Sequence, residues 1–312
     1  MDFSILIRAY NAEKFLKEAV DSILNQTCGC NIEVIILYHE GSTDRTWDVI
    51  EDLLKKTNPP PNISLKVIKH VHTTPFRSLQ IGLKEAKGKY VTFLDYDNLY
   101  PPDYLEKIYN NIVEHPDATF LFSKAVIIDE NGKVLSDLVK IPDDPYDVNK
   151  IISNNYIDGN TIILEKSCKE KIEEILSKLK HVYFDWILED WLIATLGLKF
   201  CKPLHVKNAY IYYRVHGSNT IFGQIRGNDP KSLFISECHI KTLTAMLYIF
   251  DDRKLTYRVL KTLIARHVTL IRLTSEIAGV SFVNTLLTTF RIIIGYVGYN
   301  IIVSKFKKQK RG

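Results

Sequence analysis

Apolar and polar positions alternate along residues 1–115 in a way that predicts strands and helices in turn. Buried strands of a parallel sheet are apolar on both faces, whereas the helices that join them are amphipathic. The pattern therefore predicts βαβ units, and with them an α/β fold in which helices flank a mostly parallel sheet. The predicted strands are residues 3–8, 32–37, 64–70 and 89–94, and the predicted helices are residues 12–26, 41–56 and 75–88.

The turns before the first two helices carry side chains that commonly cap helices. Asn11 stands before the first helix, and Ser42 or Thr43 stands at the start of the second. Each side-chain oxygen is expected to accept a hydrogen bond from a free backbone N–H of the first helical turn.

The pattern changes after residue 115. Residues 118–138 predict two strands joined by a turn at ENGK, and residues 208–216 predict another strand. A helix is predicted at residues 167–180, and an apolar helical run follows ILEDW within residues 184–197. From residue 231 onward the pattern is helical to the end.

Length and composition fit a folded globular protein. The chain has 312 residues, of which 46% are hydrophobic and 25% charged, so it can bury a substantial core. Its five cysteines are scattered, and only Cys28 and Cys30 lie close together, which is not a complete zinc-binding spacing. We expect all five to be reduced thiols in a cytosolic protein, since the first ten residues show no secretory leader pattern.

The positive charge is concentrated at the C-terminal end. The net charge is +5, and six lysines and arginines stand within residues 279–312 without a single acid. The rest of the chain is therefore nearly neutral, which argues against binding of nucleic acid.

Residues 280–303 are long enough to cross a bilayer, but Arg291 stands near their middle. On a helix, Asn284, Thr288 and Arg291 would form a narrow polar stripe beside a wide apolar face, and the basic end would meet anionic headgroups. We therefore favour attachment to an anionic membrane surface, on the cytoplasmic side. Burial against the body or a partner subunit, as in a homo-oligomer, and a true span are the alternatives.

Two acids follow the fourth predicted strand, in the stretch FLDYDNLYPPDYLEK. Ligands of an open parallel sheet bind outside the carboxyl ends of its strands, where Asp95 and Asp97 are expected to lie. Two carboxylates at this spacing suit a hard divalent cation that also binds phosphate oxygens. A helix-capping turn is the alternative.

Five stretches together resemble the family 2 glycosyltransferases, which have the nucleotide-sugar-binding fold called GT-A. The resemblance covers about residues 3–219 and implies an inverting transferase of the hexosyltransferase class. The stretches are, in order, SILIRAYNAEKFLKEAVDSILNQT, HEGSTDRT, AKGKYVTFLDYDNLYPPDYLEK, ILEDW and YYRVHGSN.

The resemblance implies a UDP-sugar donor held by residues that follow the first, second and fourth strands. Glu40 would accept the imide N–H of uracil, and Asp95 would approach the ribose. Arg77 would contact phosphate, with a solvated helix residue as the alternative. The implied nucleotide-sugar-binding residues are Ala9, Tyr10, Glu40, Arg77, Asp95 and Tyr96.

The metal and the catalytic base are implied by the same resemblance. Asp97 and His216 would bind Mn²⁺ or Mg²⁺ beside the diphosphate, although an ordinary strand-end histidine is the alternative for His216. Asp190 falls on the family's catalytic base, which would deprotonate an acceptor hydroxyl. An acid pair at a helix N-terminus, formed with Glu189, is the alternative.

Glu189 and two tryptophans beside it are candidates for acceptor binding. Trp186 and Trp191 flank the proposed base and would form an apolar platform for a sugar ring, with core packing as the alternative. Three positions depart from the family pattern and concern the donor base and the metal: Arg8 replaces a proline, His39 an aspartate and Asn98 a third aspartate of the metal motif.

Other function classes lack their motifs in this chain. A dinucleotide-dependent oxidoreductase needs a glycine-rich turn after its first strand, where the sequence is RAYNAEKF. A nucleotidyltransferase, which usually has a glycine-rich basic loop there, and a catalytically inactive sugar-nucleotide-binding relative are the alternatives that we retain.

The resemblance therefore implies an inverting glycosyltransferase that would use a UDP-sugar and a divalent metal to modify a hydroxyl of a glycan or lipid-linked acceptor. We expect a GT-A domain at residues 1–225, with a nucleotide-binding part at 1–115 and an acceptor part at 116–225. A helical C-terminal extension with the amphipathic basic tail is expected at residues 231–312.

Overall fold

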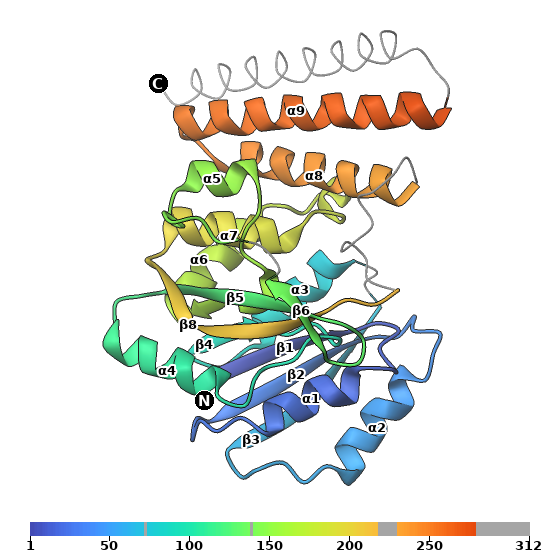
Figure 1. Cartoon of the computed structure of the whole chain (residues 1–312), viewed down its shortest axis with the longest axis vertical. Helices are drawn as coiled ribbons and strands as arrows, with labels where there is room; N and C mark the ends of the chain where they lie inside the picture. The colour runs from blue at the N-terminus through green and yellow to red at the C-terminus, as the bar shows by residue number, and fades with distance from the viewer. Residues whose placement is uncertain (72–73, 138–139, 218–229, 279–312) are drawn as a thin grey trace.

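The structure is a computed structural model, and it describes residues 1–71, 74–137, 140–217 and 230–278 (Figure 1). Its strands are β1 (Phe3–Ala9), β2 (Ile32–His39), β3 (Ile63–His70), β4 (Tyr90–Phe93), β5 (Phe120–Ile128), β6 (Val134–Asp137), β7 (Ile163–Glu165) and β8 (Pro203–Arg214). Its α-helices are α1 (Leu16–Leu24), α2 (Thr46–Lys56), α3 (Pro75–Glu85), α4 (Tyr104–Glu114), α5 (Val148–Ser153), α6 (Lys166–Leu176), α7 (Glu189–Phe200), α8 (Pro230–Ile249) and α9 (Arg253–Ala278). Two short 3₁₀ turns are η1 (Gly159–Thr161) and η2 (Val182–Phe184).

The strands form one mixed sheet in the order β3-β2-β1-β4-β7-β5-β6, with β8 paired to β5. The four strands predicted from residues 1–115 are parallel to one another, whereas β7 runs antiparallel to both β4 and β5. β5 and β6 form the hairpin that the sequence predicts around ENGK. The expected α/β fold class with a mostly parallel sheet is therefore confirmed.

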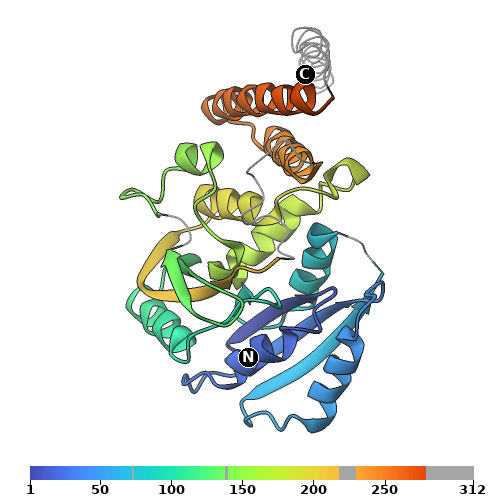
Figure 2. The same ribbon diagram turned by 45° about the vertical axis from the view of Figure 1, so that its right-hand side comes forward.

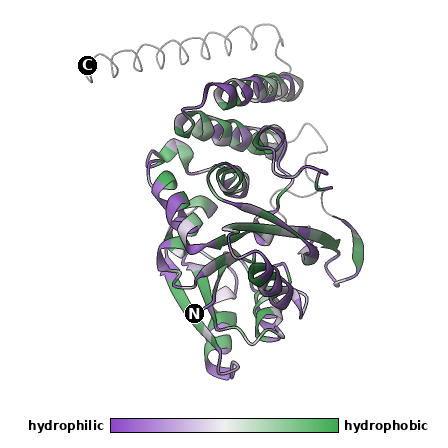
Figure 3. Ribbon diagram, turned by 90° about the vertical axis from the view of Figure 1, so that its left-hand side faces the viewer, coloured by the Kyte–Doolittle hydropathy of each residue, from purple (hydrophilic) through white to green (hydrophobic). Residues whose placement is uncertain are grey.

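Successive side chains of β1 and β2 enter two cores on opposite faces of the sheet. Ile5 and Ile36 lie in the core covered by α1, α2 and α4, and Leu6 and Leu37 lie in the core covered by α3, α6 and α7. The helices on both sides of the sheet are visible in Figure 2. Figure 3 shows apolar residues concentrated in the strands and on the helix faces turned toward them. Apolar strands buried on both faces follow directly from this arrangement.

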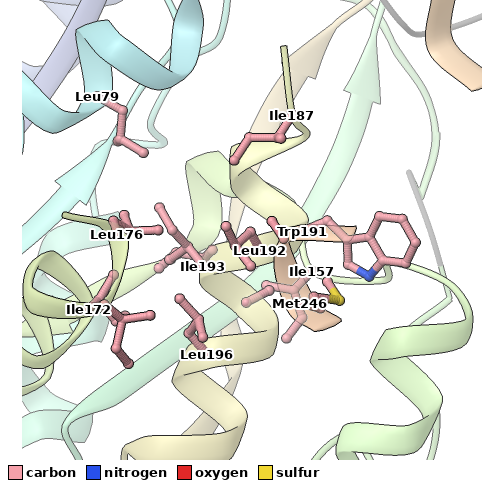
Figure 4. Packing of buried hydrophobic residues seen from close by; sticks show 14 of the residues in the cluster. Leu79, Ile157, Ile172, Leu176, Ile187, Trp191, Leu192, Ile193, Leu196 and Met246 are labelled. Atoms are coloured by element: carbon pink, nitrogen blue, oxygen red, sulfur yellow. The ribbon is translucent and has the colours of Figure 1, made fainter. Parts of the chain in front are cut away.

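α7 is enclosed by protein on all sides, and its residues from Trp191 to Leu198 are buried. Leu192, Ile193 and Leu196 pack with side chains of α3, α6 and α8 (Figure 4). α8 and α9 continue this core on the side away from the sheet, as Figure 1 shows, and they confirm the prediction of helices after residue 231 as far as the described chain extends.

The tail predicted to be amphipathic, residues 280–303, lies outside the described residues. Within the described ranges, which end at residue 278, the structure has no helix that combines the length and the apolar character needed to span a membrane.

The two helix caps predicted from the sequence are wrong. α1 begins at Leu16 and α2 at Thr46, and neither has a side-chain cap. Asn11 instead adopts a left-handed backbone conformation with φ 49°, and its Oδ1 accepts a hydrogen bond from the Thr43 N–H at 2.8 Å. Ser42 Oγ accepts one from the Asn11 N–H at 3.3 Å. The cap-type side chains therefore tie the loop after β1 to the loop after β2.

Two of the five cysteines form a disulfide, so the expectation that all five are reduced is wrong. Cys168 lies in the first turn of α6 and Cys201 at the C-terminal cap of α7, with their Cα atoms 5.6 Å apart. The two are 33 residues apart in the sequence and form no local motif. They meet because α6 packs against α7. Cys28, Cys30 and Cys238 are buried free thiols.

Replacing Gly197 by alanine tests how α7 packs on the sheet. A Cβ at this position would lie 2.3 Å from two ring carbons of Phe120, a fully buried residue of β5. Overpacking of this kind costs about 1–3 kcal/mol, so we expect Gly197→Ala to lower the free energy of unfolding in urea by about that amount. Gly29→Ala is the control, because a Cβ there meets nothing within 4 Å. Equal losses in the two variants would contradict this account of the packing.

Candidate functional site

The carboxyl ends of β1 and β4 lie side by side, because these strands are parallel neighbours. Asp95 follows β4, and its backbone N–H donates to Asn160 Oδ1 at 2.5 Å. Asn160 Nδ2 donates to the Asp95 carboxylate at 3.2 Å and to Asp158 Oδ1 at 2.8 Å. The η1 turn therefore fixes the first of the two predicted aspartates.

Arg8, near the end of β1, lies between two acidic side chains. Its Nε and Nη2 donate to Asp95 Oδ1 at 3.2 and 2.6 Å, and its Nη1 forms an ion pair with Glu189. Burial alone would lower the pKa of Arg8, but the two carboxylates outweigh burial and raise this pKa above its ordinary value. Arg8 is thus a permanent positive charge that joins the end of β4 to the start of α7.

Asp97 is held by residues at and beyond the end of β8. His216 Nε2 lies 3.0 Å from Asp97 Oδ2, and Arg214 Nε donates to the Asp97 carbonyl at 2.9 Å. Arg214 is 1% exposed, and its Nη2 pairs with Glu18 at 2.7 Å. Burial and then the charge of Asp95 raise the pKa of Asp97, while His216 opposes both effects.

The two predicted metal ligands, Asp97 and His216, are therefore brought together. In the described parts of the chain, no group of three or more His, Cys, Asp or Glu side chains is arranged to hold a metal ion. A Mg²⁺ ion commonly takes one or two carboxylates and completes its shell with phosphate oxygens and water. The pair fits a cation of this kind, whose remaining ligands would come from a bound substrate.

Asp190 is the second residue of α7, where the positive end of the helix dipole favours an anion. Its Oδ2 accepts a hydrogen bond from Asn155 Nδ2 at 3.1 Å. Burial, followed by repulsion from Glu189 and Asp158, raises the pKa of Asp190 to about 7. A carboxylate with such a pKa can accept a proton near neutral pH.

The segment from Asn155 to Asn160 was not among the predicted site residues, although it contacts Asp95 and Asp190. Burial raises the pKa of Asp158 to about 6, even though hydrogen bonds from Asn160 lower it. A Cβ on Gly159 would lie 3.0 Å from the Asp190 Cβ, so η1 packs closely on the candidate base. The only sequence signal for this segment is an Asp-Gly-Asn turn, which says nothing of the neighbours it meets.

The predicted nucleotide end of the site lies at the ends of β1 and β2. Tyr10 is 52% exposed, and its ring meets the His39 ring edge-on with centroids 5.0 Å apart. Glu40 is exposed beyond His39, whereas Ala9 is buried at the end of β1. Tyr96 is partly buried, and burial followed by the neighbouring carboxylates raises its pKa to about 12. Tyr10 and Glu40 are therefore the accessible side chains of this group.

Arg77 contacts the segment that leads to α7. It pairs with Asp185 at 2.6 Å, and its remaining donors reach Gln80 and the carbonyl oxygens of residues 179–181. The phosphate contact implied for Arg77 would have to replace some of these bonds.

The two tryptophans beside Asp190 have different surroundings. Trp191 is 1% exposed, and its Nε1 donates to the Ile151 carbonyl at 2.6 Å. Trp191 lies in the hydrophobic core (Figure 4). Core packing was the alternative to an acceptor platform that the sequence left open for this residue. Trp186 is 38% exposed and meets Phe234 edge-on at 5.3 Å, so it alone of the two offers an open ring face.

A cavity of about 550 Å³ lies elsewhere, against Lys89, Tyr90, Glu165 and Lys202 among other residues. Tyr90 begins β4 and Asp95 follows its end, so the cavity and the carboxylates are separated by roughly 16 Å along the chain. We therefore assign the cavity no part in this site.

Comparison with known proteins gives one family and several relatives. Glycosyl transferase family 2 matches residues 4–170. The chain is 29% identical over 227 residues to an uncharacterized glycosyltransferase of Haemophilus influenzae, and 34% identical over 221 residues to the minor teichoic acid biosynthesis protein GgaB of Bacillus subtilis. These matches cover 70% and 69% of this chain but 66% and 23% of the relatives, so the chain spans less than two thirds of either one.

Solved structures share the fold. Residues 1–349 of Staphylococcus aureus TarS, in complex with UDP-GlcNAc, match with a TM-score of 0.61 and 18% identity, over 92% of this chain and 82% of that one. The mannosyltransferase PcManGT of Pyrobaculum calidifontis, in complex with GDP-Man and Mn²⁺, matches with a TM-score of 0.56 and 16% identity, over 97% and 83%. At such identities the likeness establishes a shared fold alone.

Asp190→Asn should stabilise the protein at alkaline pH. The folded pKa of Asp190, about 7, lies above its ordinary value of 3.8, so the folded state binds the proton more tightly and stability falls as pH rises through that window. Above it, the folded protein bears the cost of a partly buried charge, which asparagine removes. We expect the variant to exceed wild type in melting temperature at pH 8 and to differ little at pH 4. The exposed Asp143→Asn is the control, and a lower melting temperature of Asp190→Asn at pH 8 would refute the assignment.

Proposed function

The chain belongs to glycosyl transferase family 2, and on this premise we propose that it is an inverting glycosyltransferase. It would move a sugar, in the manner of a hexosyltransferase, from a UDP-sugar to a hydroxyl of a glycan or lipid-linked acceptor. The observation that carries the proposal is that Arg8 joins Asp95, at the carboxyl end of β4, to the first turn of α7, where the pKa of Asp190 is raised to about 7. This arrangement supports a donor side and a catalytic base within one site.

We assign the donor to the exposed side chains after β1 and β2. Tyr10 would flank the base, Glu40 would accept the imide N–H of uracil, and Asp95 would approach the ribose. The complexes of two fold neighbours with UDP-GlcNAc and GDP-Man support a nucleotide sugar. The choice of uridine rests on the carboxylate of Glu40.

In the proposed reaction, the acceptor oxygen attacks the anomeric carbon from the face opposite to the diphosphate. The bond between that carbon and the diphosphate oxygen breaks, and the nucleoside diphosphate leaves with the bonding electrons. The acceptor proton passes to the carboxylate of Asp190. Glu189, one residue earlier, points about 100° away on the helix and is paired with Arg8, so it is not placed for the same hydroxyl.

Asp97 and His216 are the residues proposed to hold a Mn²⁺ or Mg²⁺ ion. When bound, the ion would neutralise charge on the leaving diphosphate. Arg214 keeps the backbone of Asp97 in place through its hydrogen bond to the carbonyl. The complex of PcManGT with Mn²⁺ supports a metal in a protein of this fold.

The acceptor side of the proposal rests on fewer residues. Trp186, with its accessible ring, and Glu189 are proposed to border the acceptor. A relative named for minor teichoic acid biosynthesis supports a polymer of the teichoic acid kind as the acceptor class. We further propose contact of the C-terminal basic residues with the anionic cytoplasmic face of a membrane, with pairing of two chains through these helices as the competing use.

Asp190→Asn should abolish most of the transfer. Asparagine keeps the shape of the side chain but cannot take the proton, and general-base catalysis contributes about 10²–10⁴-fold. We expect nucleotide release, measured over a panel of UDP-sugars with acceptor present, to fall by at least about 10²-fold, while calorimetric UDP binding is kept. Glu189→Gln is the matched control and should be milder. Wild-type turnover in Asp190→Asn, or a dead Glu189→Gln, would assign the base elsewhere.

Removing the metal should weaken binding of the diphosphate. Asp97 and His216 supply too few ligands to hold an ion tightly, so UDP and Mn²⁺ should each bind more tightly in the presence of the other. Calorimetry of UDP in Mn²⁺ and in EDTA measures this coupling, with Asp97→Ala as the variant. UDP affinity that is the same in Mn²⁺, in EDTA and in Asp97→Ala would rule out the metal bridge.

A further inference from the structure

We propose that Arg8 is a positioning residue that holds the first turn of α7, and Asp190 with it, against the donor side of the site. The inference rests on the proposed function, in which Asp190 receives the acceptor's proton. Arg8 belongs to β1, whereas its partners Asp95 and Glu189 stand 87 and 181 residues later. One guanidinium therefore joins three elements that are remote in the sequence.

The geometry of arginine suits this task. Its planar, forked guanidinium holds its donors in fixed directions on two sides, whereas the three donors of the lysine ammonium rotate together about a single nitrogen. Nε and Nη2 of Arg8 both reach Asp95 Oδ1, at 3.2 and 2.6 Å, which leaves Nη1 for Glu189. The side chains of Arg8 and Glu189 are 30% and 14% exposed, so water screens this pair only in part.

The pairing directs the two acids at the start of α7 to different neighbours. Glu189 turns to Arg8, while Asp190 accepts from Asn155 and lies against Gly159. Without the guanidinium, Glu189 would have no counter-charge in this contact, and its repulsion from Asp190 would act on the same helical turn. Arg8 therefore sets both the direction of this turn and the charge beside the base.

The charged and titratable groups that face Asp190 come from α7, β1, β8 and the residue before η1. Glu189 of α7 and Asp158, just before η1, disfavour its ionised form, whereas Arg8 of β1 favours it. Tyr213 of β8 is also close enough to be affected: burial first, and then the charges of neighbouring acids that include Asp190, raise the pKa of its hydroxyl. Removal of Arg8 and removal of the Glu189 charge should thus move the pKa of Asp190 in opposite directions, although both break the same ion pair.

This opposition separates a positioning role from a purely structural one. We would follow the carboxyl of Asp190 by ¹³C NMR in the free protein, with the resonance identified by its loss in Asp190→Asn. Arg8→Gln should raise the midpoint, and Glu189→Gln should lower it, each by roughly half a pH unit or more. Arg8→Lys keeps the charge and should stay near wild type. Equal midpoints in wild type and Arg8→Gln, or shifts of the two glutamine variants in one direction, would overturn the proposal.

Steady-state kinetics of sugar transfer provide a second test of the proposal. In a plot of kcat/KM against pH, the midpoint of the acid limb should shift among wild type and the variants in the same order as the NMR midpoints of Asp190. Arg8→Lys, which keeps the charge but not the fork, should lose roughly tenfold or more in kcat, since small misplacements of reacting groups are costly. Wild-type kcat in Arg8→Lys would overturn the positioning role. If no UDP-sugar is turned over by wild type, the proposed function fails, while the NMR midpoints still decide the role of Arg8.

Discussion

Several carboxylates lie close together in a partly buried site, and the free-energy cost of their desolvation and mutual repulsion is the constraint on which the rest of this structure depends. Burial raises the pKa of Asp97, Asp158 and Asp190, and repulsion from neighbouring acids raises each of these pKa values further. Such a cluster persists only where positive charges and amide donors are brought to it. Arg8 comes from β1, His216 from just beyond the end of β8, and Asn160 from η1. The acids concerned are Asp95, Asp97, Asp158, Glu189 and Asp190.

The sheet explains how these groups meet. β1 and β4 are parallel neighbours, so their carboxyl ends deliver Arg8 and Asp95 to one edge. β8 reaches the same edge by pairing in parallel with β5, and an isolated bridge joins Leu99 to Tyr212. α7 is packed into the core along its length, and this holds its first turn at the site. A rigid scaffold of this kind is what allows oppositely charged groups to be placed within hydrogen-bond distance.

Local patterns in the sequence were enough for β1 to β6, for α1 to α3 and for the acids after β4, because each depends on periodicity or on strand ends. They did not predict β7, α4 or α5. Asn11 shows where such reasoning stops: it has the side chain of a helix cap, yet it bonds to Thr43 on a neighbouring loop. Asn160 and the Cys168–Cys201 disulfide likewise depend on partners that only the folded chain brings near. The sequence shows that Arg8 departs from the family pattern. It does not show that Arg8 pairs with two carboxylates.

The bonds between the loops after β1 and β2 bear on the entropy of ligand binding. Besides Asn11 and Thr43, the Glu13 N–H donates to Asp44 Oδ2 at 3.0 Å and the Arg45 N–H donates to Glu13 Oε2 at 2.8 Å. Ordering a backbone residue costs about 1–2 kcal/mol of conformational free energy. In these loops that cost is met as the chain folds, so a nucleotide bound there, as we propose, would contact a surface that is already ordered.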